Sequence, residues 1–421
     1  MINRPRGTYD VLPDEAAKWQ YLERVFRKII ESYGYEEIRT PVFEETELFR
    51  RSIGEATDIV EKEMYSFTDQ KGRSFTLRPE GTASVIRAYL EAGMRPDVLM
   101  KLYYYGDMFR YDRPQKGRYR QFRQMGVEAI GSSNPAIDAE VISLAMFLLG
   151  KLGISGLELN INSVGCIDCR GFYYEKLKDF IRSNNTKMCN TCQARIERNP
   201  MRVFDCKEED CKAVLRSAPK ITDSLCQACR AALDEVKKYL SVLGIVFVEN
   251  PGLVRGLDYY TRTAFEIICK KIDSPQQNTI IAGGRYDNLV KDLGGPDAPA
   301  VGWAMGMERI LLAVEACNVE LSLKPSISFH VASLGDKAFA EAFKTAEKLR
   351  RKGFSVNLSI SDKSLKAQMR EANRLGVRYA LILGDDELSR GVVLVRDMQA
   401  SSQKEISLKN IENEIASLFI V

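Results

Sequence analysis

Six short segments rich in β-branched and aromatic residues follow one another through the chain with few helical patterns between them. Parallel strands need a crossover connection, usually a helix, whereas consecutive strands with sparse helices pair antiparallel. The pattern therefore predicts an α+β fold on an antiparallel sheet. The expected strands are 74–77, 100–108, 126–130, 157–162, 263–269 and 279–282, and the clearest helices are 22–33, 83–92, 136–152 and 308–316.

Two stretches interrupt this pattern and divide the 421 residues. From 166 to 240, cysteines, charges and helical spacing replace the strand-formers, which indicates a helical insertion. A polar stretch ends at Pro325, and strand-like and helical segments alternate regularly beyond it. We therefore expect a larger domain at 1–320, which contains the insertion, and a smaller α/β domain at 328–421.

A single histidine, His330, limits the chemistry that is open to the chain. Histidine–serine, histidine–cysteine and histidine–metal mechanisms have almost no residues to use, and we expect His330 to be buried and structural. The net charge is +4 from 61 basic and 57 acidic residues, so a nucleic acid would be held by local basic patches. Catalysis then rests on carboxylates, arginines, tyrosines and backbone groups.

The sequence also predicts a compartment. The N-terminal MINRPRGTYDVLP lacks an apolar run after its basic residues, and no stretch reaches about 18 consecutive apolar residues. Ten cysteines in such a protein are expected to be reduced thiols or metal ligands. We expect a cytoplasmic protein.

A basic and aromatic segment, YGDMFRYDRPQKGRYRQFRQMGVE at 105–128, carries the densest functional signal. Arginine pairs bidentately with phosphate and aromatic rings stack on bases, so the segment suits a nucleotide, a polynucleotide or both. A solvated basic hairpin is the plainer alternative. Against it, the apolar flank 102–109 is typical of a core strand that would aim Arg110 into a cleft, and turn residues at 114–117 predict a protruding tip.

Phosphate binding would have to proceed without a glycine-rich loop, because neither GxxxxGK[ST] nor GxGxxG occurs. Arginines from several segments would then hold a nucleoside triphosphate. Each such arginine could instead form a structural ion pair, but four in separate segments favour phosphate. The candidates are Arg110, Arg255, Arg285 and Arg309.

Eight cysteines form four close pairs inside the insertion. Paired thiols at this spacing are typical of zinc ligands, and one or two ions would stabilise a subdomain whose own core is small. Reduced thiols packed as small hydrophobic side chains are the alternative. We favour structural zinc with no direct part in catalysis, held among Cys166, Cys169, Cys189, Cys192, Cys206, Cys211, Cys226 and Cys229.

Five segments occur in order along the chain: RGTYDVLP at 6–13, FRYDRPQKGRYRQF at 109–122, LVRGLDYYTRTAFE at 253–266, AGGRYDNLV at 282–290 and AVGWAMGMERILL at 300–312. Together with the first helix, a short strand and Pro41, they resemble the class II aminoacyl-tRNA synthetases, specifically the histidyl-tRNA synthetase family. The resemblance covers essentially the whole chain. It implies ATP-dependent ligation of L-histidine to tRNA(His) through a histidyl-adenylate, with release of AMP and diphosphate.

The resemblance implies roles for particular residues. Arg110 would grip the α-phosphate of ATP, Arg255 would lie beside both substrates, and Arg309 would hold the distal phosphates and the adenine side. Phe122 would stack on adenine, and Mg²⁺ would accompany the phosphates. Histidine would be bound by polar groups, which discriminate better than shape alone: Glu80, Thr82, Gln124, Glu128, Tyr259, Tyr260 and Tyr286. For Glu80, a carboxylate at a helix start remains an alternative.

The same resemblance implies contacts with tRNA(His). It also implies a homodimer, because the first helix, the short strand and Pro41 resemble the first class II motif, which builds the dimer interface. Arg113 and Gln115 would read the acceptor end, and the C-terminal domain would bind the anticodon. Asp112 stands where the family more often has glutamate, so the reach of that carboxylate is in question. One helical face of the C-terminal domain suits either phosphate contact or plain solvation; it carries Lys363, Lys366, Arg370 and Arg374.

Two other functions fit part of the pattern. A catalytically inactive, histidine-sensing regulatory paralogue of an ATP phosphoribosyltransferase typically lacks the anticodon domain and has eroded arginine motifs, whereas residues 338–421, Arg110, Gln115, Arg255 and Arg309 are present here. A zinc-dependent RNA-binding module would explain the cysteines and the basic loop. It leaves the tyrosine- and glycine-rich segments without a purpose, so we expect the ligase.

Overall fold

The structure is a computed structural model that describes residues 2–55, 57–95, 98–254, 256–274, 277–323, 327–360 and 363–417. The chain divides into two compact units, Met1–Leu321 and Ser322–Val421. Among the described residues, no helix combines the length and the apolar content that a membrane span requires.

In the described part of the first unit, eight strands form one sheet in the order β1-β5-β6-β11-β10-β9-β7-β8. The six central strands pair antiparallel, while the edge strands β1 and β8 pair parallel with their neighbours. The predicted α+β fold on an antiparallel sheet is confirmed. The strands are β1 (Glu36–Glu37), β5 (Met100–Phe109), β6 (Gln121–Ile130), β7 (Leu157–Ser163), β8 (Val248–Glu249), β9 (Thr261–Cys269), β10 (Thr279–Arg285) and β11 (Ala300–Gly306).

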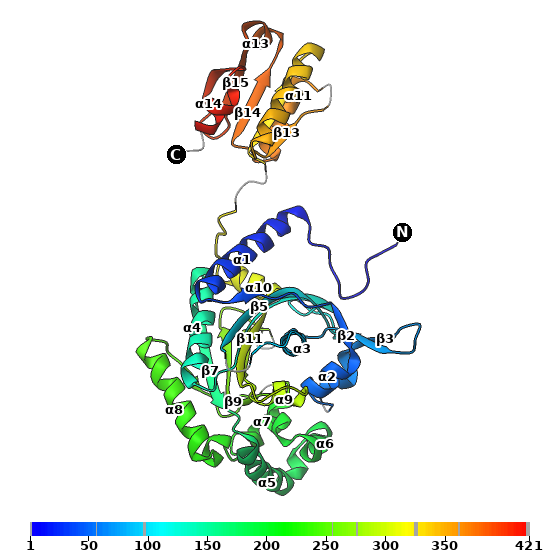
Figure 1. Ribbon diagram of the computed structural model, residues 1–421, viewed down its shortest axis with the longest axis vertical. Coiled ribbons are helices and arrows are strands. Elements are labelled where there is room, and N and C mark those ends of the chain that lie inside the picture. The colour runs from blue at the N-terminus through cyan, green and yellow to red at the C-terminus, as the bar shows by residue number, and fades with distance from the viewer. Residues whose placement is uncertain are drawn as a thin grey trace. The chain divides into compact units, whose positions relative to one another are not determined.

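Helices pack on both faces of this sheet, because successive side chains of a strand point to opposite faces. Tyr103 of β5 packs in an apolar cluster with one set of helices, and its neighbours Leu102 and Tyr104 pack in a second cluster with another set. Figure 1 shows α4 and α8 side by side along the sheet. The first set is α1 (Pro13–Ser32), α4 (Pro135–Lys151), α8 (Gln227–Val242) and α10 (Met307–Ala316), and the second includes α3 (Thr82–Glu91), α5 (Ile167–Ser183) and α6 (Asn190–Arg198).

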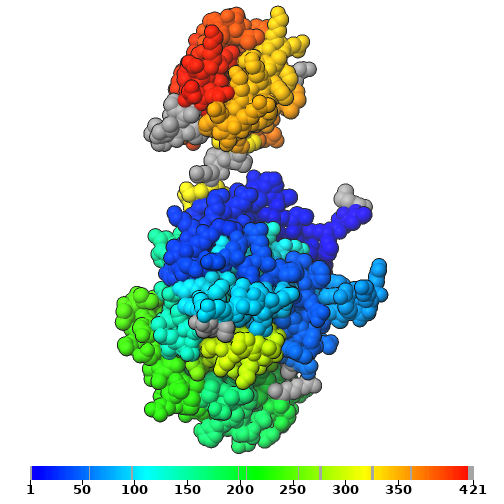
Figure 2. Space-filling model, in the orientation of Figure 1, coloured from blue at the N-terminus to red at the C-terminus, as the bar shows by residue number. Residues whose placement is uncertain are grey.

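Several strands of the first unit differ from the sequence prediction, and the short strands β2, β3 and β8 were not predicted. The segment 74–77 is a strand, but it belongs to a separate three-stranded sheet in the order β2-β4-β3, whose β3–β4 end projects from the unit (Figure 2). The central strand β11 was not predicted, because Gly302 and Gly306 lower its strand propensity. The small sheet and its neighbours comprise β2 (Phe43–Glu45), α2 (Thr46–Ile53), a π-helix (Ile59–Glu63), β3 (Tyr65–Thr68) and β4 (Ser74–Leu77), and a short α9 (Leu289–Asp292) follows β10.

The insertion between β7 and β8 contains helices and no strand among its described residues, as predicted. Helices α5, α6 and α7 gather at one end of the unit (Figure 1), whereas α8 returns along the sheet and packs against α4. Val236 and Leu240 of α8 are fully buried in the main core, so the insertion is anchored to the sheet at its end. Its remaining elements are η2 (Asn185–Lys187), η3 (Pro200–Asp205), α7 (Glu209–Leu215) and η4 (Ile221–Ser224).

The second unit has the predicted alternation of strands and helices. Its described strands form a sheet in the order β13-β12-β14-β15-β16, parallel across the first three and antiparallel across the last two. The helix α13 and the edge strand β16 were not predicted. The elements are β12 (Phe329–Ser333), α11 (Asp336–Arg351), β13 (Val356–Leu358), α12 (Leu365–Arg374), β14 (Tyr379–Leu383), α13 (Asp385–Arg390), β15 (Val392–Asp397), β16 (Gln403–Ser407) and α14 (Ile411–Ser417).

His330 lies buried in β12, as expected. Its Nδ1 is 2.9 Å from Asn357 Nδ2, and its Nε2 has no hydrogen-bond partner among the described residues. Burial lowers the pKa of His330, so the ring is neutral at physiological pH. A neutral ring inside the smaller unit has a structural role.

Candidate active site

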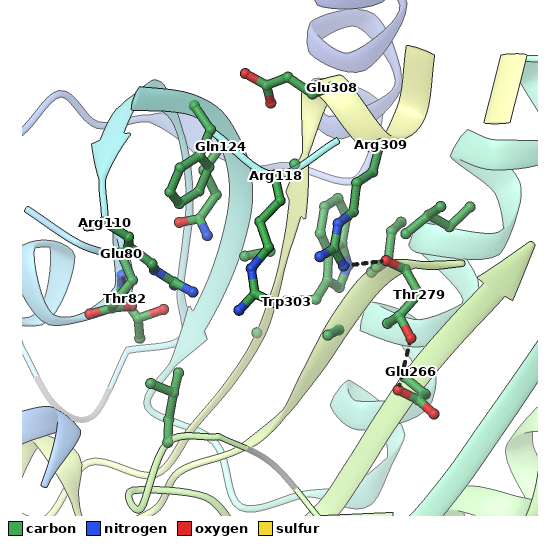
Figure 3. Close-up of a pocket in the computed structure, with 18 of the residues that line it drawn as sticks. Glu80, Thr82, Arg110, Arg118, Gln124, Glu266, Thr279, Trp303, Glu308 and Arg309 are labelled. Atoms are coloured by element: carbon green, nitrogen blue, oxygen red, sulfur yellow. Dashed lines mark hydrogen bonds between the residues drawn. The ribbon is translucent and has the colours of Figure 1, made fainter. Parts of the chain in front are cut away.

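A cavity of about 500 Å³ opens on the sheet of the first unit, between β6, β10, β11 and the loop that joins β5 to β6. Figure 3 shows part of its lining. Segments that are far apart in the sequence meet here because the antiparallel strands bring them side by side. The lining includes ten residues named from the sequence: Glu80, Thr82, Arg110, Phe122, Gln124, Glu128, Tyr259, Tyr260, Tyr286 and Arg309.

Two residues proposed to contact tRNA lie outside the cavity lining. Arg113 and Gln115 are exposed at the tip of the β5–β6 loop and do not line the cavity. The loop tip is ordered by a pair of backbone hydrogen bonds of 3.0 and 2.9 Å between Gln115 and Arg118. Arg255 lies outside the described residues.

One end of the cavity is acidic and rich in hydroxyl groups. Gln124 and Glu128 lie on β6 at positions i and i+4, which point to the same face of a strand. Gln124 Oε1 accepts hydrogen bonds from Tyr104 Oη at 3.0 Å and from Gly81 N at 3.1 Å. These two donors orient the amide of Gln124 towards the cavity (Figure 3).

Glu128 is a buried carboxylate at this end of the cavity, and its pKa is strongly raised. Thr82 Oγ1 donates to its Oε1 at 2.7 Å, and Tyr286 Oη donates to its Oε2. Burial raises the pKa of Glu128 to about 8, although both hydrogen bonds act in the opposite direction. The carboxyl group is therefore mostly protonated at pH 7 in the empty cavity.

The close approach of Glu128 depends on a glycine in the neighbouring strand. Gly302 pairs with Glu128 across β6 and β11, and a Cβ at residue 302 would lie 1.9 Å from Glu128 Oε2. The same Cβ would lie 2.3 Å from the backbone oxygen of Val127. A side chain at 302 would therefore displace the carboxylate.

Glu80 has the structural role that was left open as an alternative. Its two carboxylate oxygens accept hydrogen bonds of 2.8 Å from the backbone N–H groups of Thr82 and Ala83, at the start of α3. Burial raises the pKa of Glu80, and these backbone donors act against that rise. Glu80 therefore both caps α3 and lines the cavity.

Three tyrosines form the wall beside Glu128. The ring centroids of Tyr259 and Tyr260 are 4.8 Å apart, and those of Tyr259 and Tyr286 are 5.5 Å apart. All three side chains are more than 90% buried. Burial raises the pKa of Tyr259 and of Tyr286 well above the usual value, so these hydroxyls stay protonated and can donate hydrogen bonds.

The other end of the cavity is cationic. Arg110, Arg118 and Arg309 reach into the same space (Figure 3). Arg110 Nε donates to Pro79 O at 2.8 Å, and its guanidinium carbon lies 5.3 Å from the centre of the Phe122 ring. Arg309 Nη1 donates to Thr279 O at 2.9 Å. Fixed guanidinium groups beside an aromatic ring suit a nucleotide with several phosphates.

The shorter carboxylate of Asp112 has a partner in this structure. Asp112 Oδ2 forms an ion pair with Arg118 Nε, and both residues line the cavity. Arg110 and Arg118 also flank the carboxylate of Glu63, whose pKa is nevertheless raised by burial. The loop thus balances its cations with acidic side chains that hold them in place.

Arg285 is a correction to the sequence prediction, because it does not line the cavity. The residue is 1% exposed, and its guanidinium pairs with Asp138 and Asp287. Its Nη1 also donates to Ser132 O at 2.8 Å. Arg285 is therefore a buried structural ion pair and not a phosphate ligand. Gly283 and Gly284, which precede Arg285, allow β10 to pair closely with β9 and β11. A phosphate-binding arginine beside glycines would have the same sequence pattern, so the sequence alone did not distinguish the two roles.

Several lining residues were not proposed from the sequence. Glu266 Oε2 accepts a hydrogen bond from Thr279 Oγ1 at 3.2 Å, beside Arg309 (Figure 3). Glu308 Oε1 accepts from Tyr9 Oη and from Arg123 N, both at 2.9 Å. Glu266, Trp303 and Glu308 lie inside segments that carry the family resemblance, whereas Thr279 lies outside them and had no distinguishing signal in the sequence.

An antiparallel sheet that carries an arginine-lined cavity, without a glycine-rich phosphate loop, defines the class: a class II aminoacyl-tRNA synthetase catalytic domain. The family model for histidyl-tRNA synthetase matches residues 7–310, and the model for an anticodon-binding domain matches residues 328–418. The chain belongs to the histidyl-tRNA synthetase family.

Individual relatives agree with this assignment. A histidine–tRNA ligase of Desulforamulus reducens is 49% identical over 412 residues, which cover 98% of each protein. A crystal structure of apo histidyl-tRNA synthetase from S. aureus has a TM-score of 0.83 at 39% identity, covering 98% of this chain and 99% of that one. A Bacillus halodurans structure described as an ATP phosphoribosyltransferase regulatory subunit/histidyl-tRNA synthetase has a TM-score of 0.62 at 23% identity, which shows a shared fold; it covers 91% of this chain and 98% of that one.

Proposed function

We propose that this protein is a histidine–tRNA ligase that activates L-histidine with ATP and transfers it to tRNA(His). The observation that best supports this proposal is the cavity, which has an arginine-rich end beside Phe122 and an acidic, tyrosine-rich end. The two ends match the two substrates of the first step. Their product is a histidyl-adenylate, formed when the histidine carboxylate attacks the α-phosphorus of ATP and diphosphate leaves.

The arginine end binds ATP in this proposal. Arg110 holds the α-phosphate, where negative charge develops as diphosphate departs, and Arg309 holds the distal phosphates. Phe122 stacks on adenine, since aromatic faces bind bases without regard to sequence. Arg255, which lies outside the described residues, is assigned to both substrates by the family resemblance. Positioning and charge neutralisation carry this step, because the attacking group belongs to the substrate.

ATP enters with Mg²⁺ as part of the substrate. The ion usually keeps several waters, bridges phosphate oxygens and takes one or two carboxylates. Glu266 fits this requirement, because its carboxylate lines the cavity near Arg309 and the backbone of Thr279. The ion would supply charge neutralisation on the phosphates, and Glu266 would hold it.

The acidic end binds histidine. Glu128 accepts a hydrogen bond from one imidazole nitrogen, and the hydroxyls of Tyr259, Tyr260 or Tyr286 meet the other polar groups. Thr82 and Tyr286 hold Glu128 in position before the ligand arrives. Gln124 and Glu80 complete the polar wall. A site that pairs both ring nitrogens rejects amino acids without them, because its buried polar groups would remain unpaired.

The second step needs tRNA(His) at two places. Arg113 and Gln115 are exposed at the loop tip beside the cavity, where they can contact the acceptor end. In the second unit Lys366, Arg370 and Arg374 are exposed on α12, which suits phosphate contacts of an anticodon stem. The adenylate is then attacked by the terminal hydroxyl of the tRNA, and AMP leaves.

A homodimer in the cytoplasm completes the proposal. The segment with the first-motif resemblance exposes Val42 and Phe43, and the neighbouring β3 exposes Phe67. The rings of Phe43 and Phe67 contact each other and Phe75, which gives an apolar surface of the kind that a second copy covers. Sedimentation equilibrium of the wild type should give twice the chain mass.

The regulatory paralogue is the weaker account. The chain retains the second unit and a cavity with Arg110, Arg118 and Arg309 in place. The relative with a regulatory description is 23% identical and shares the fold. The ligase relative is 49% identical over nearly the full length.

Amino-acid-dependent exchange of labelled pyrophosphate into ATP tests the proposal. We expect exchange with histidine and with none of the other nineteen amino acids. The absence of exchange in a folded sample that still binds histidine would refute the ligase function. In that case a regulatory protein would be the better account.

A further inference from the structure

The insertion brings its eight cysteines together in two separate groups of four. Within each group the sulfur atoms lie within 4.8 Å of one another. The pairs do not combine in chain order. The first and fourth pairs form an outer cluster of Cys166, Cys169, Cys226 and Cys229, and the second and third pairs form an inner cluster of Cys189, Cys192, Cys206 and Cys211.

The sulfur spacing fits a single tetrahedral ion. Four ligands about 2.3 Å from a shared centre lie roughly 3.8 Å from one another. The distance from Cys189 Sγ to Cys206 Sγ is 3.8 Å, and that from Cys166 Sγ to Cys169 Sγ is 3.5 Å. A disulfide would need about 2.05 Å. An iron–sulfur cluster binds each thiolate to an iron beside bridging sulfides, which spreads the thiolates further apart than one shared ion does.

The backbone around both clusters is arranged for thiolates. Cys226 N donates to Cys169 Sγ at 3.0 Å, and Cys189 N donates to Cys211 Sγ at 3.2 Å. Cys166, Cys189 and Cys226 each immediately precede a helix, at the positive end of its dipole. Buried thiols that pack only as small apolar groups do not require such donors.

We propose that the insertion binds two zinc ions, one in the outer cluster and one in the inner cluster. Each ion would bind four thiolates, and the thiol protons would be released to solvent. The inner cluster lies in the sequence between the first and fourth cysteine pairs. The loop that the outer ion would close therefore contains the whole inner cluster. This arrangement would hold in place the five short helical elements between α5 and α8, in addition to the apolar residues that they bury.

The inner ion would position a surface that contacts the cavity wall. Its ligands Cys192 and Cys206 lie on either side of η3. Asn199 Nδ2, just before η3, donates to Asp258 Oδ1 at 2.8 Å, and Arg202 Nη2 lies 3.6 Å from Asp58 Oδ2. Asp258 immediately precedes Tyr259 and Tyr260 of the cavity. Loss of the inner ion would therefore loosen the histidine end of the cavity.

Zinc counting on the full chain tests the proposal. Inductively coupled plasma and native mass spectrometry of wild type from zinc-supplemented medium should both give two zinc ions per chain. The variants Cys206→Ser and Cys226→Ser should each retain one ion. Cys317→Ser is the matched control, since Cys317 lies outside both clusters, and it should retain two.

Three results would overturn the proposal: fewer than two zinc ions in the wild type at saturating zinc, iron in place of zinc, or two zinc ions retained by either serine variant. If the serine variants fail to fold, titration of wild-type thiols with a mercurial decides, and the two ions should be released by reaction of eight thiols. The metal count requires no catalytic activity, so its failure is distinct from failure of the ligase proposal.

Discussion

Substitution of Glu128 by glutamine tests the histidine end of the cavity most directly. The carboxyl group is buried and has a pKa of about 8 in the empty cavity. A bound imidazole N–H would donate to the ionised form, so histidine binding has to deprotonate Glu128 below pH 8. Between pH 7 and pH 9 the ionised fraction rises from roughly one tenth to nine tenths. The wild-type KM for histidine should therefore fall about tenfold over this interval because of Glu128 alone.

Glutamine at 128 keeps the shape of the side chain but cannot ionise. It loses a hydrogen bond to a charged acceptor, worth about 1.5–3 kcal/mol, which corresponds to roughly a 10- to 150-fold higher KM for histidine at high pH. The ratio of the variant KM to the wild-type KM should therefore increase about tenfold from pH 7 to pH 9. The titrations of histidine itself are common to both proteins and cancel in this ratio.

The assay is ATP–pyrophosphate exchange with varied histidine at pH 7, 8 and 9, and the KM for ATP is the internal control. A KM ratio that stays constant with pH would contradict the buried, titrating carboxylate. An equal rise in the KM for ATP would show that the substitution disturbs the whole cavity, and the assignment of Glu128 to histidine would fail.

Four further substitutions separate the roles assigned above. Arg110→Ala should lower kcat about 100- to 1000-fold in the exchange assay with the KM for histidine unchanged, since one preorganised donor to the developing charge is lost; a rise in the KM for histidine alone would contradict it. Arg285→Met should destabilise the fold by about 3–5 kcal/mol in urea unfolding, because Asp138 loses its buried partner; a change in the KM for ATP at wild-type stability would refute the structural assignment. Gly302→Ala should lower kcat/KM for histidine by up to about 100-fold, since the added Cβ displaces Glu128; kinetics like those of the wild type would show that the carboxylate is not fixed. Asn199→Ala should raise the KM for histidine more than the KM for ATP while both zinc ions are retained, and equal effects would contradict the contact through Asp258.

The sequence predicted the antiparallel sheet, because strand-formers in β5, β7, β9 and β10 stand out from their surroundings. It did not predict β11, although this strand lies between β6 and β10. Glycine lowers strand propensity, yet Gly302 is required there because only a residue without a Cβ leaves space for Glu128. Gly302, which leaves space for Glu128 in the cavity, is thus also a residue that weakens the strand pattern of β11 in the sequence.

The sequence predicted many of the cavity side chains that lie within a family motif. It did not predict those that reach the cavity only because the fold places their strand there. Arg110 and Arg285 have similar surroundings in the sequence, but one reaches the cavity and the other meets Asp138, which is 147 positions away. Thr279, which lies outside every family segment, enters the lining through strand register alone. The pairing of the cysteines is likewise a property of the folded insertion, since the spacing is compatible with several groupings.

The position of the insertion has a consequence for biosynthesis. Strands β7 and β9 pair directly, yet the ribosome has to release the whole insertion between them before β9 exists. Until then Leu159 and Ile161 of β7, which are buried in the finished core, lack their partner strand and expose an aggregation-prone edge. An insertion that collapses early brings the ends of this long loop together and shortens that interval. Cells starved of zinc are therefore expected to accumulate less of the protein in soluble form, through folding yield and not through turnover of the finished enzyme.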